Sequence, residues 1–251
     1  MKMFYYEIMK LFRQKHIYFG IAAGLIFSML GFLYHLGNPD ASAFEIPVTG
    51  LGNLVNTYFI LFPLAFSGFL FSEEERKGTL KIIAAKGTPR VVIAVIKVIA
   101  ACLFSLLVFL LIHAFLTVLG GLFFHAAPFE GQGGGVISHT IAFALVFQAF
   151  FFQWLGCLFL TALVLLWTIV FRSAVFGFGA SLFSIIIMIL LSNLDAFKTF
   201  LPLDRLGVWE HVLRVDPNYT ALRADLSVLG IFTGIILLLS VIIWSAREVR
   251  N

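Results

Sequence analysis

One short segment of this chain, from Ser72 to Lys97, concentrates the residues that could do chemistry. It reads SEEERKGTLKIIAAKGTPRVVIAVIK and holds three consecutive glutamates together with six lysines or arginines. Apolar runs long enough to cross a bilayer flank it on both sides. The charges must therefore lie in water, where they could bind a soluble partner.

The segment is predicted to form a short helix along the membrane surface. Its glutamates suit a helix N-terminus, where the dipole favours negative charge. Leu80, Ile82 and Ile83 give a short apolar stripe, and Pro89 ends it because proline disfavours helix in the residue before it. A solvated loop that only sets the topology would carry the same charges, so these residues alone leave both interpretations open.

The rest of the chain offers no catalytic or metal-binding motif. It contains no G-x-x-x-x-G-K-[ST] phosphate loop, no G-x-S-x-G nucleophile turn and no H-E-x-x-H zinc motif. The six histidines are scattered, and Cys102 and Cys157 both lie in apolar runs, which argues against a disulfide framework. We expect a protein that is not an enzyme and that binds no metal or cofactor itself.

Composition indicates a membrane protein. The 251 residues are 61% hydrophobic and 12% charged, whereas soluble domains average about 45–50% apolar and about 25% charged. Uncharged runs of roughly 20 residues recur, which is the length of a helix that crosses the hydrocarbon core. We predict an all-α fold with six transmembrane spans within residues 17–251, at 17–36, 51–71, 91–119, 136–171, 174–194 and 226–246.

The third and fourth predicted spans are longer than a bilayer requires. They must tilt, extend past the membrane or contain a break. Gly120 and Gly121 are expected to close the third span, and the glycines between 131 and 135 to precede the fourth.

The distribution of lysine and arginine predicts the topology. Under the positive-inside rule, these residues remain on the cytoplasmic side. Thirteen of the 17 lie on one side of the predicted spans, and the other four share one loop with five acids. The remaining loops of that second side, 37–50 and 120–135, contain neither residue type. Both termini are therefore expected in the cytoplasm, and the net charge of +4 reflects orientation rather than nucleic-acid binding.

Residues 1–16 are predicted to form an amphipathic helix rather than a cleavable signal peptide. Phe4, Ile8 and Leu11 share one face, whereas the basic residues Lys10 and Arg13 lie on the other. Such a helix lies in the headgroup plane. It would anchor the first span or brace a cytoplasmic assembly.

Polar residues, a proline and a phenylalanine inside the predicted spans are candidates for a transport pathway. Close helix packing is the alternative explanation of polar and small residues in membranes, and for these residues the simpler one. No acid lies within the spans, which weakens a proton- or sodium-coupled carrier. The pathway candidates are Asn56 and Pro63 on the second span, Gln153 on the fourth, and Phe183 and Ser184 on the fifth.

The loop from Asp195 to Asp225 is expected to form one or two short helices punctuated by Pro202 and Pro217. On physical grounds, these helices would form an amphipathic lid on the outer leaflet. The apolar residues of the lid are Phe197, Phe200, Leu201, Leu206, Trp209, Val212 and Leu213.

The charged segment resembles the connection between the second and third spans of ABC-2 type transporter permeases. The shared pattern is E-x-x-x-G-T-L, then P-R, then a lysine seven residues later, carried here by Glu74 or Glu75, Gly78, Thr79, Leu80, Pro89, Arg90 and Lys97. The likeness is sharp over residues 71–97 and covers the whole chain in outline. In length and small outer loops, the chain is most similar to short permeases of bacteriocin and lantibiotic immunity systems and to related peptide exporters.

This resemblance implies that the segment is a coupling helix. Such a helix docks in a cleft of a separate ATPase subunit and passes ATP-driven motion to the spans. ATP and Mg²⁺ would then be bound by the partner ATPase and not by this chain. The implied ATPase-coupling residues are Glu73, Glu74, Glu75, Gly78, Thr79, Leu80, Ile83, Pro89 and Arg90.

We therefore expect a multi-pass permease subunit of a bacterial plasma membrane, in contact with lipid. It would form one half of a dimeric pore with an identical or sister permease. By alternating access it would export amphipathic or antimicrobial peptides, or similar hydrophobic substrates. The alternative is an ATP-independent membrane protein, either a secondary carrier or a structural subunit of another complex.

Overall fold

The structure of the chain, a computed structural model, describes residues 9, 15–37, 41–53, 89–132, 134–194 and 201–246. The predicted leader lies almost entirely outside these ranges. Most of the described residues are helical, in α2 (Lys15–His35), α3 (Glu45–Asn53), α6 (Arg90–Phe123), α7 (His139–Phe171), α8 (Ala174–Ser192) and α10 (Tyr219–Ala246). The other described elements are two 3₁₀ helices, η2 (Pro202–Arg205) and η3 (Val208–His211), and two strands, β1 (Phe129–Glu130) and β2 (Val136–Ile137).

Four helices of the described part of the chain are long and apolar enough to cross a membrane: α6, α7, α8 and α10. The chain is thus a largely helical membrane protein. α2 occupies most of the first predicted span, and α3 begins before the second. The number of six spans stays a prediction.

The two longest predicted spans contain no break. α6 has 34 residues and α7 has 33, which makes each helix about 50 Å long at 1.5 Å per residue. α6 continues past Gly120 and Gly121, where its end was expected, as far as Phe123. Gly120 instead allows a close contact, because a Cβ at this position would collide with the backbone carbonyl of Ala43.

Local backbone signals set the other helix ends. α7 starts later than the predicted span because Val136 and Ile137 pair with Glu130 and Phe129 in an antiparallel hairpin, which the sequence analysis did not predict. Arg172 takes a left-handed conformation, with φ of 55°, and ends α7. At the last helix, Asn218 Oδ1 accepts a hydrogen bond from Ala221 N at 3.0 Å, so that α10 begins before the predicted span.

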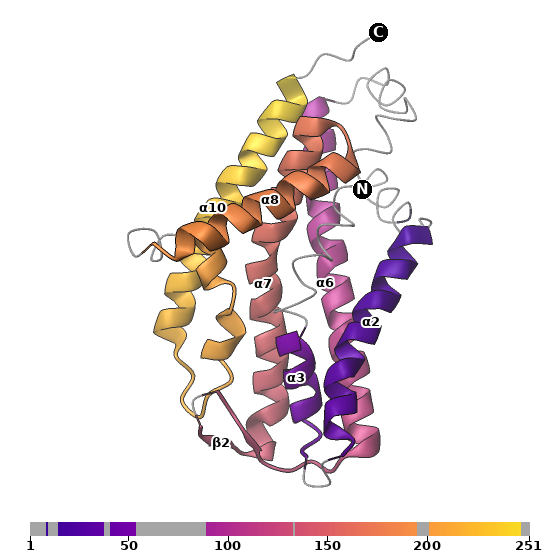
Figure 1. Ribbon diagram of the computed structural model, residues 1–251, viewed down its shortest axis with the longest axis vertical. Helices are drawn as coiled ribbons and strands as arrows, with labels where there is room; N and C mark the ends of the chain where they lie inside the picture. Colours follow the sequence, from indigo (N-terminus) through magenta and orange to yellow (C-terminus); the bar gives the residue numbers. More distant parts are fainter. Residues whose placement is uncertain are drawn as a thin grey trace.

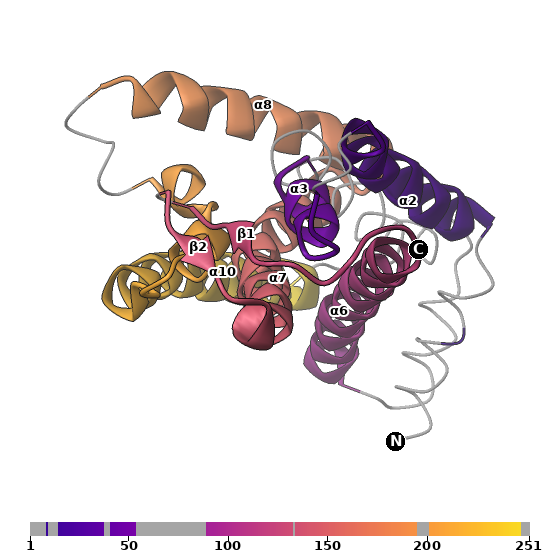
Figure 2. The same ribbon diagram turned by 90° about the horizontal axis from the view of Figure 1, so that it is seen from below.

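α7 is the central helix of the fold. It packs against α6, α8, α10 and η3 (Figure 1), and it is the most buried of the four long helices. Figure 2 shows α8 along one side of the bundle, where it contacts α7 and η2. α8 and α10 consequently leave broad apolar faces uncovered.

Small and polar residues bring α7 and α8 together. A Cβ on Gly177 would lie 2.5 Å from Thr168 Oγ1 and 2.6 Å from Thr168 Cα. Trp167 Nε1 donates a hydrogen bond to Ser184 Oγ at 2.9 Å. By contrast, Gly179 faces open space. Gly177 and Ser184 thus act in helix packing, as small and polar residues do in membranes.

The three loops expected on the outside lie at one end of the molecule. Figure 1 shows the α2–α3 loop, the α6–α7 loop and the segment before α10 at this end. The first residues of α6 and the last residues of α7 and α10 lie at the other end, and α2 begins part of the way toward it. Basic residues Arg90 and Arg172 begin or follow helices at this second end. The arrangement agrees with the segregation of charge in the sequence.

We expect Gly177→Ala to destabilise the protein by about 1–3 kcal/mol, because the added methyl group meets the backbone of Thr168, which cannot move aside alone. The matched control is Gly179→Ala, which adds the same group in open space and should leave stability unchanged or slightly raised. Thermal unfolding in detergent measures the difference. Equal melting temperatures for the two variants would contradict the close approach of α7 and α8.

The predicted topology has a direct test. Reporter fusions after Asn251 and at Asp204 should score on opposite sides of the membrane, with the Asn251 fusion cytoplasmic. The charge distribution and the separation of the two ends in Figure 1 are the physical reasons. Labelling of both positions from the same side would exclude the predicted topology.

Candidate functional site

Three connecting segments join into one cap, which covers helix ends and extends along α7. We call residues 41–44, 124–132, 134–138 and 201–218 the cap. Ser42 Oγ donates to the carbonyl of Ala127 at 2.5 Å, and Ala43 N donates to the carbonyl of His125 at 3.0 Å. Gln132 N donates to the carbonyl of Leu213 at 2.6 Å. Each bond connects segments that are distant in sequence, so the three predicted outer loops support one another.

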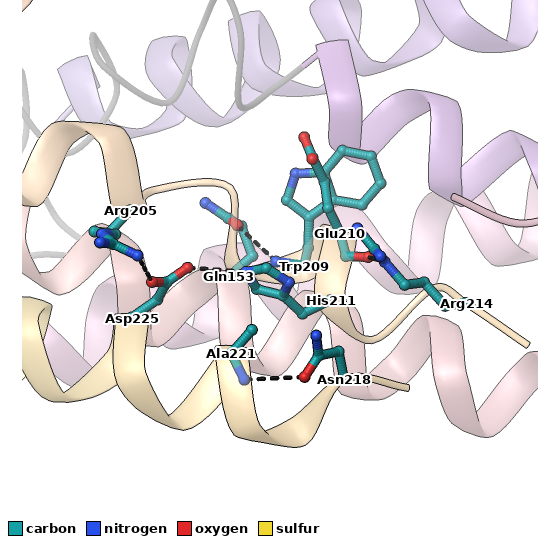
Figure 3. A network of polar contacts seen from close by, with 9 residues as sticks. All are labelled: Gln153, Arg205, Trp209, Glu210, His211, Arg214, Asn218, Ala221 and Asp225. Atoms are coloured by element: carbon teal, nitrogen blue, oxygen red, sulfur yellow. Dashed lines mark hydrogen bonds and ion pairs between the residues drawn. The ribbon is translucent and has the colours of Figure 1, made fainter. Parts of the chain in front are cut away.

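Asp225 ties two parts of the cap to α10 (Figure 3). Its Oδ1 accepts a hydrogen bond from Arg205 Nη1, at the end of η2, at 2.5 Å. Its Oδ2 lies 2.9 Å from Nε2 of His211, at the end of η3. We call these three residues the clamp. Because both oxygens of one carboxylate are engaged, η2 and η3 depend on the same side chain.

The clamp is largely shielded from solvent. Asp225 is 6% exposed and lies in the second turn of α10, near a helix N-terminus that favours negative charge. A buried carboxylate is tolerated when it is paired and hydrogen-bonded. Loss of one member of a buried pair costs far more than the intact pair contributes. The clamp therefore fixes the position of the cap more than it adds to overall stability.

Gln153 anchors the cap to α7. Its side chain is completely buried in a helix that is otherwise almost entirely apolar. Its Oε1 accepts a hydrogen bond from the backbone N of Trp209 at 3.4 Å, and its Nε2 lies 3.6 Å from Cys157 Sγ. An unpaired buried amide would cost about 1–3 kcal/mol. The polar residue in the middle of α7 thus holds η3 in place.

Apolar side chains of the last cap segment face the protein interior. Leu206, Trp209, Val212 and Leu213 are all buried, and η3 packs against α7 and α10. The expectation that these residues lie on the outer leaflet is therefore wrong, because two helices cover them. Phe197 and Phe200 of the predicted lid lie outside the described residues.

A second polar contact joins α2 to α3 at the same end. His35, the last residue of α2, places Nε2 2.9 Å from Thr49 Oγ1 and Nδ1 3.5 Å from Glu45 Oε2. His35 is itself buried. The short helix α3 is consequently fixed to α2 beside the cap.

The structure describes only the last two of the predicted ATPase-coupling residues. Pro89 directly precedes α6, and its carbonyl accepts hydrogen bonds from the amides of Val92 and Ile93. Arg90 is the first residue of α6. Lys97 of the family pattern is fully buried two turns further along this helix. The residues outside the described part are Glu73, Glu74, Glu75, Gly78, Thr79, Leu80 and Ile83.

The predicted pathway residues lie in different places. Asn56 and Pro63 fall outside the described residues. Gln153 lies under the cap, whereas Ser184 bonds to Trp167, about 20 Å further along α7. Phe183 is 64% exposed on α8. The described candidates therefore do not form one cluster.

The arrangement holds segments of the chain together by polar contacts. Within the described ranges, no three His, Cys, Asp or Glu side chains are placed to bind a metal ion. Both oxygens of the Asp225 carboxylate are engaged by the clamp partners. The clamp is thus a polar contact that joins η2 and η3 to α10.

Long apolar helices closed at one end by a hydrogen-bonded cap define the chain as a polytopic membrane protein. Residues 3–189 match the family model described as ABC-2 family transporter protein. The match covers more than half of the chain, so the chain belongs to the ABC-2 family of transporters. It is a permease subunit of an ABC transporter, without a catalytic role of its own, and membership implies an ABC ATPase partner. No curated protein sequence matches it.

The family match confirms the resemblance to ABC-2 permeases that the charged segment indicated. It ends within α8, so Arg205, His211 and Asp225 lie beyond it. Sequence reasoning missed the clamp. The mixture of acids and bases in the loop from 195 to 225 signals ion pairs, but it does not say which residues pair.

We expect Asp225→Asn to loosen the cap by about 2 kcal/mol, because it leaves Arg205 and His211 facing a neutral amide in a shielded site. A cysteine at buried Val212 would report the opening. Its reaction with a membrane-impermeant maleimide should accelerate about thirtyfold.

Asp216→Asn is the matched control, since Asp216 lies on the same segment but is exposed. It should leave the labelling rate unchanged. Equal rates in Asp225→Asn and in the unsubstituted parent would show that the clamp does not hold the cap.

Proposed function

We propose that the chain is one of two permease subunits of an exporter in the bacterial plasma membrane. A separate ABC ATPase would bind ATP and Mg²⁺ and drive the transport of amphipathic peptides or similar hydrophobic substrates. Membership of the ABC-2 family supports transport driven by ATP. It favours this function over an ATP-independent carrier or a structural subunit. The peptide class rests on the resemblance of the short chain to bacteriocin and lantibiotic immunity permeases.

The position of α6 supports a coupling mechanism. This helix begins at Arg90, directly after the proposed coupling residues, and ends at the cap. It packs against α2, α3, α7 and α10 on the way. A helix is stiff over such a length, so a displacement at the start of α6 would reach the cap end. We therefore assign residues Glu73 to Arg90 to ATPase contact, on the cytoplasmic side with both termini.

The surfaces of the described helices suit a hydrophobic cargo and a membrane setting. Exposed residues of α8 such as Phe183, Ile186 and Leu190 are apolar. The ionisable side chains Lys97 and Asp225 are turned inward and buried. In the proposed dimer, lipid and a second permease, identical or a sister chain, would cover the apolar faces. Substrate would leave beneath the cap at the outer end.

The coupling assignment predicts unequal effects of two substitutions. Ile83→Asp should abolish binding of the ATPase, because a docked apolar anchor carries much of the affinity. Lys86→Ala, three residues away, should weaken binding fivefold or less, because a rim charge contributes about 0.2–1 kcal/mol.

Pull-down of the ATPase with each full-length variant measures this difference, alongside the hydrolysis rate in nanodiscs. The two variants must first be shown to insert into the membrane to equal levels. Binding of the ATPase by Ile83→Asp at the unsubstituted level would reduce the charged segment to a topology-setting loop.

A further inference from the structure

We propose that Trp209 contacts the transported substrate and selects it by a hydrogen bond. The indole N–H would donate to an accepting oxygen of the substrate, such as a peptide carbonyl or a phosphoryl group. This inference rests on the proposed export function and adds to it a specificity-determining residue and the chemistry that residue recognises.

The indole of Trp209 carries a buried donor that has no partner among the described residues. Trp209 is 5% exposed, and its Nε1 lies inside the protein without a hydrogen-bond partner in the described part of the chain. An indole N–H can only donate, and buried tryptophans usually satisfy this group. An unsatisfied buried donor costs about 1–3 kcal/mol. A ligand oxygen at this position would remove that cost.

Two other tryptophans show how this chain normally satisfies an indole. Trp154 Nε1 donates to Ser105 Oγ at 3.0 Å, between α7 and α6. Trp167 Nε1 donates to Ser184 Oγ at 2.9 Å, between α7 and α8. Each bond holds two helices together. Trp209 is held through its backbone N instead, which leaves the indole N–H available.

The indole lies beside α3, at the end of the molecule where the proposed export function has the substrate leave. Its Cζ2 and Cη2 atoms lie 3.8 Å from the point that a Cβ on Gly52 would occupy. Cζ2 is attached to the ring carbon that bears Nε1, so the donor is on the ring edge nearest to α3. Figure 3 shows the ring turned away from Asp225, so the donor is separate from the clamp.

The first test is peptide-stimulated hydrolysis by the complete permease–ATPase complex in phosphatidylcholine nanodiscs. The probe is the lantibiotic nisin. Trp209→Phe removes the N–H but keeps an aromatic ring, and it should raise the half-stimulating nisin concentration about fivefold, which corresponds to one neutral hydrogen bond of about 1 kcal/mol. The maximal rate at saturating nisin should not change, because the substitution weakens binding only. Trp154→Phe, which removes a structural bond, should leave the half-stimulating concentration unchanged.

The second test observes the donor directly and needs no ATPase. The permease with Trp154, Trp167 and Trp244 replaced by Phe keeps a single ¹⁵N-labelled indole at position 209. Its N–H resonance should move downfield when nisin is added. Addition of phosphatidylglycerol without peptide forms a separate arm, and a shift in that arm alone would assign the acceptor to a lipid phosphoryl group. A shift with either probe supports the inference.

An indole resonance that neither probe moves would overturn the inference, as would unchanged nisin dependence in Trp209→Phe. The first of these results would assign the donor to bound water or to packing. Failure of the proposed function would be visible separately, as an ATPase that neither associates with the permease nor responds to nisin.

Discussion

A lipid environment cannot hydrogen-bond the peptide backbone, and the architecture of this permease follows from that constraint. α6 and α7 run for 34 and 33 residues without a break, so their backbone groups are satisfied within the helix. The non-helical backbone between the long helices gathers largely in the cap. There, bonds such as Ala43 to His125 and Gln132 to Leu213 let one loop satisfy another. The described loops are thus joined to one another at one end of the bundle.

Within the bundle, α7 connects the cap with α8. Gln153 holds the cap to one portion of the helix, and Trp167 holds α8 to another. The close contact at Gly177 leaves little freedom between α7 and α8. A displacement of α7 would consequently act on the cap and on α8 together.

The clamp adds a second attachment of the cap, to α10. Gln153 of α7 and Asp225 of α10 both bind the cap segment that contains η2 and η3. Both side chains are buried, so neither contact is weakened by water while the cap stays closed. For an ABC permease, opening at this end requires either that α7 and α10 carry the cap with them or that one of these contacts separates.

The sequence by itself determined the class of the protein, the approximate positions of its long helices and the charge asymmetry between its two ends. These properties depend on runs of neighbouring residues, and a hydrophobic run or a cluster of lysines needs no distant partner to be recognised. Only the tertiary structure decided what individual polar residues do. Gln153 and Ser184 are polar residues of the kind that line transport pathways, but they bond to Trp209 and Trp167. The two partners of Asp225 lie 14 and 20 residues away in the sequence. The sequence predicted a helix end at Gly120, whereas in the structure this glycine allows the backbone of Ala43 to approach α6 closely. Which distant residues contact each other depends on how the helices pack, and local sequence patterns do not contain this information.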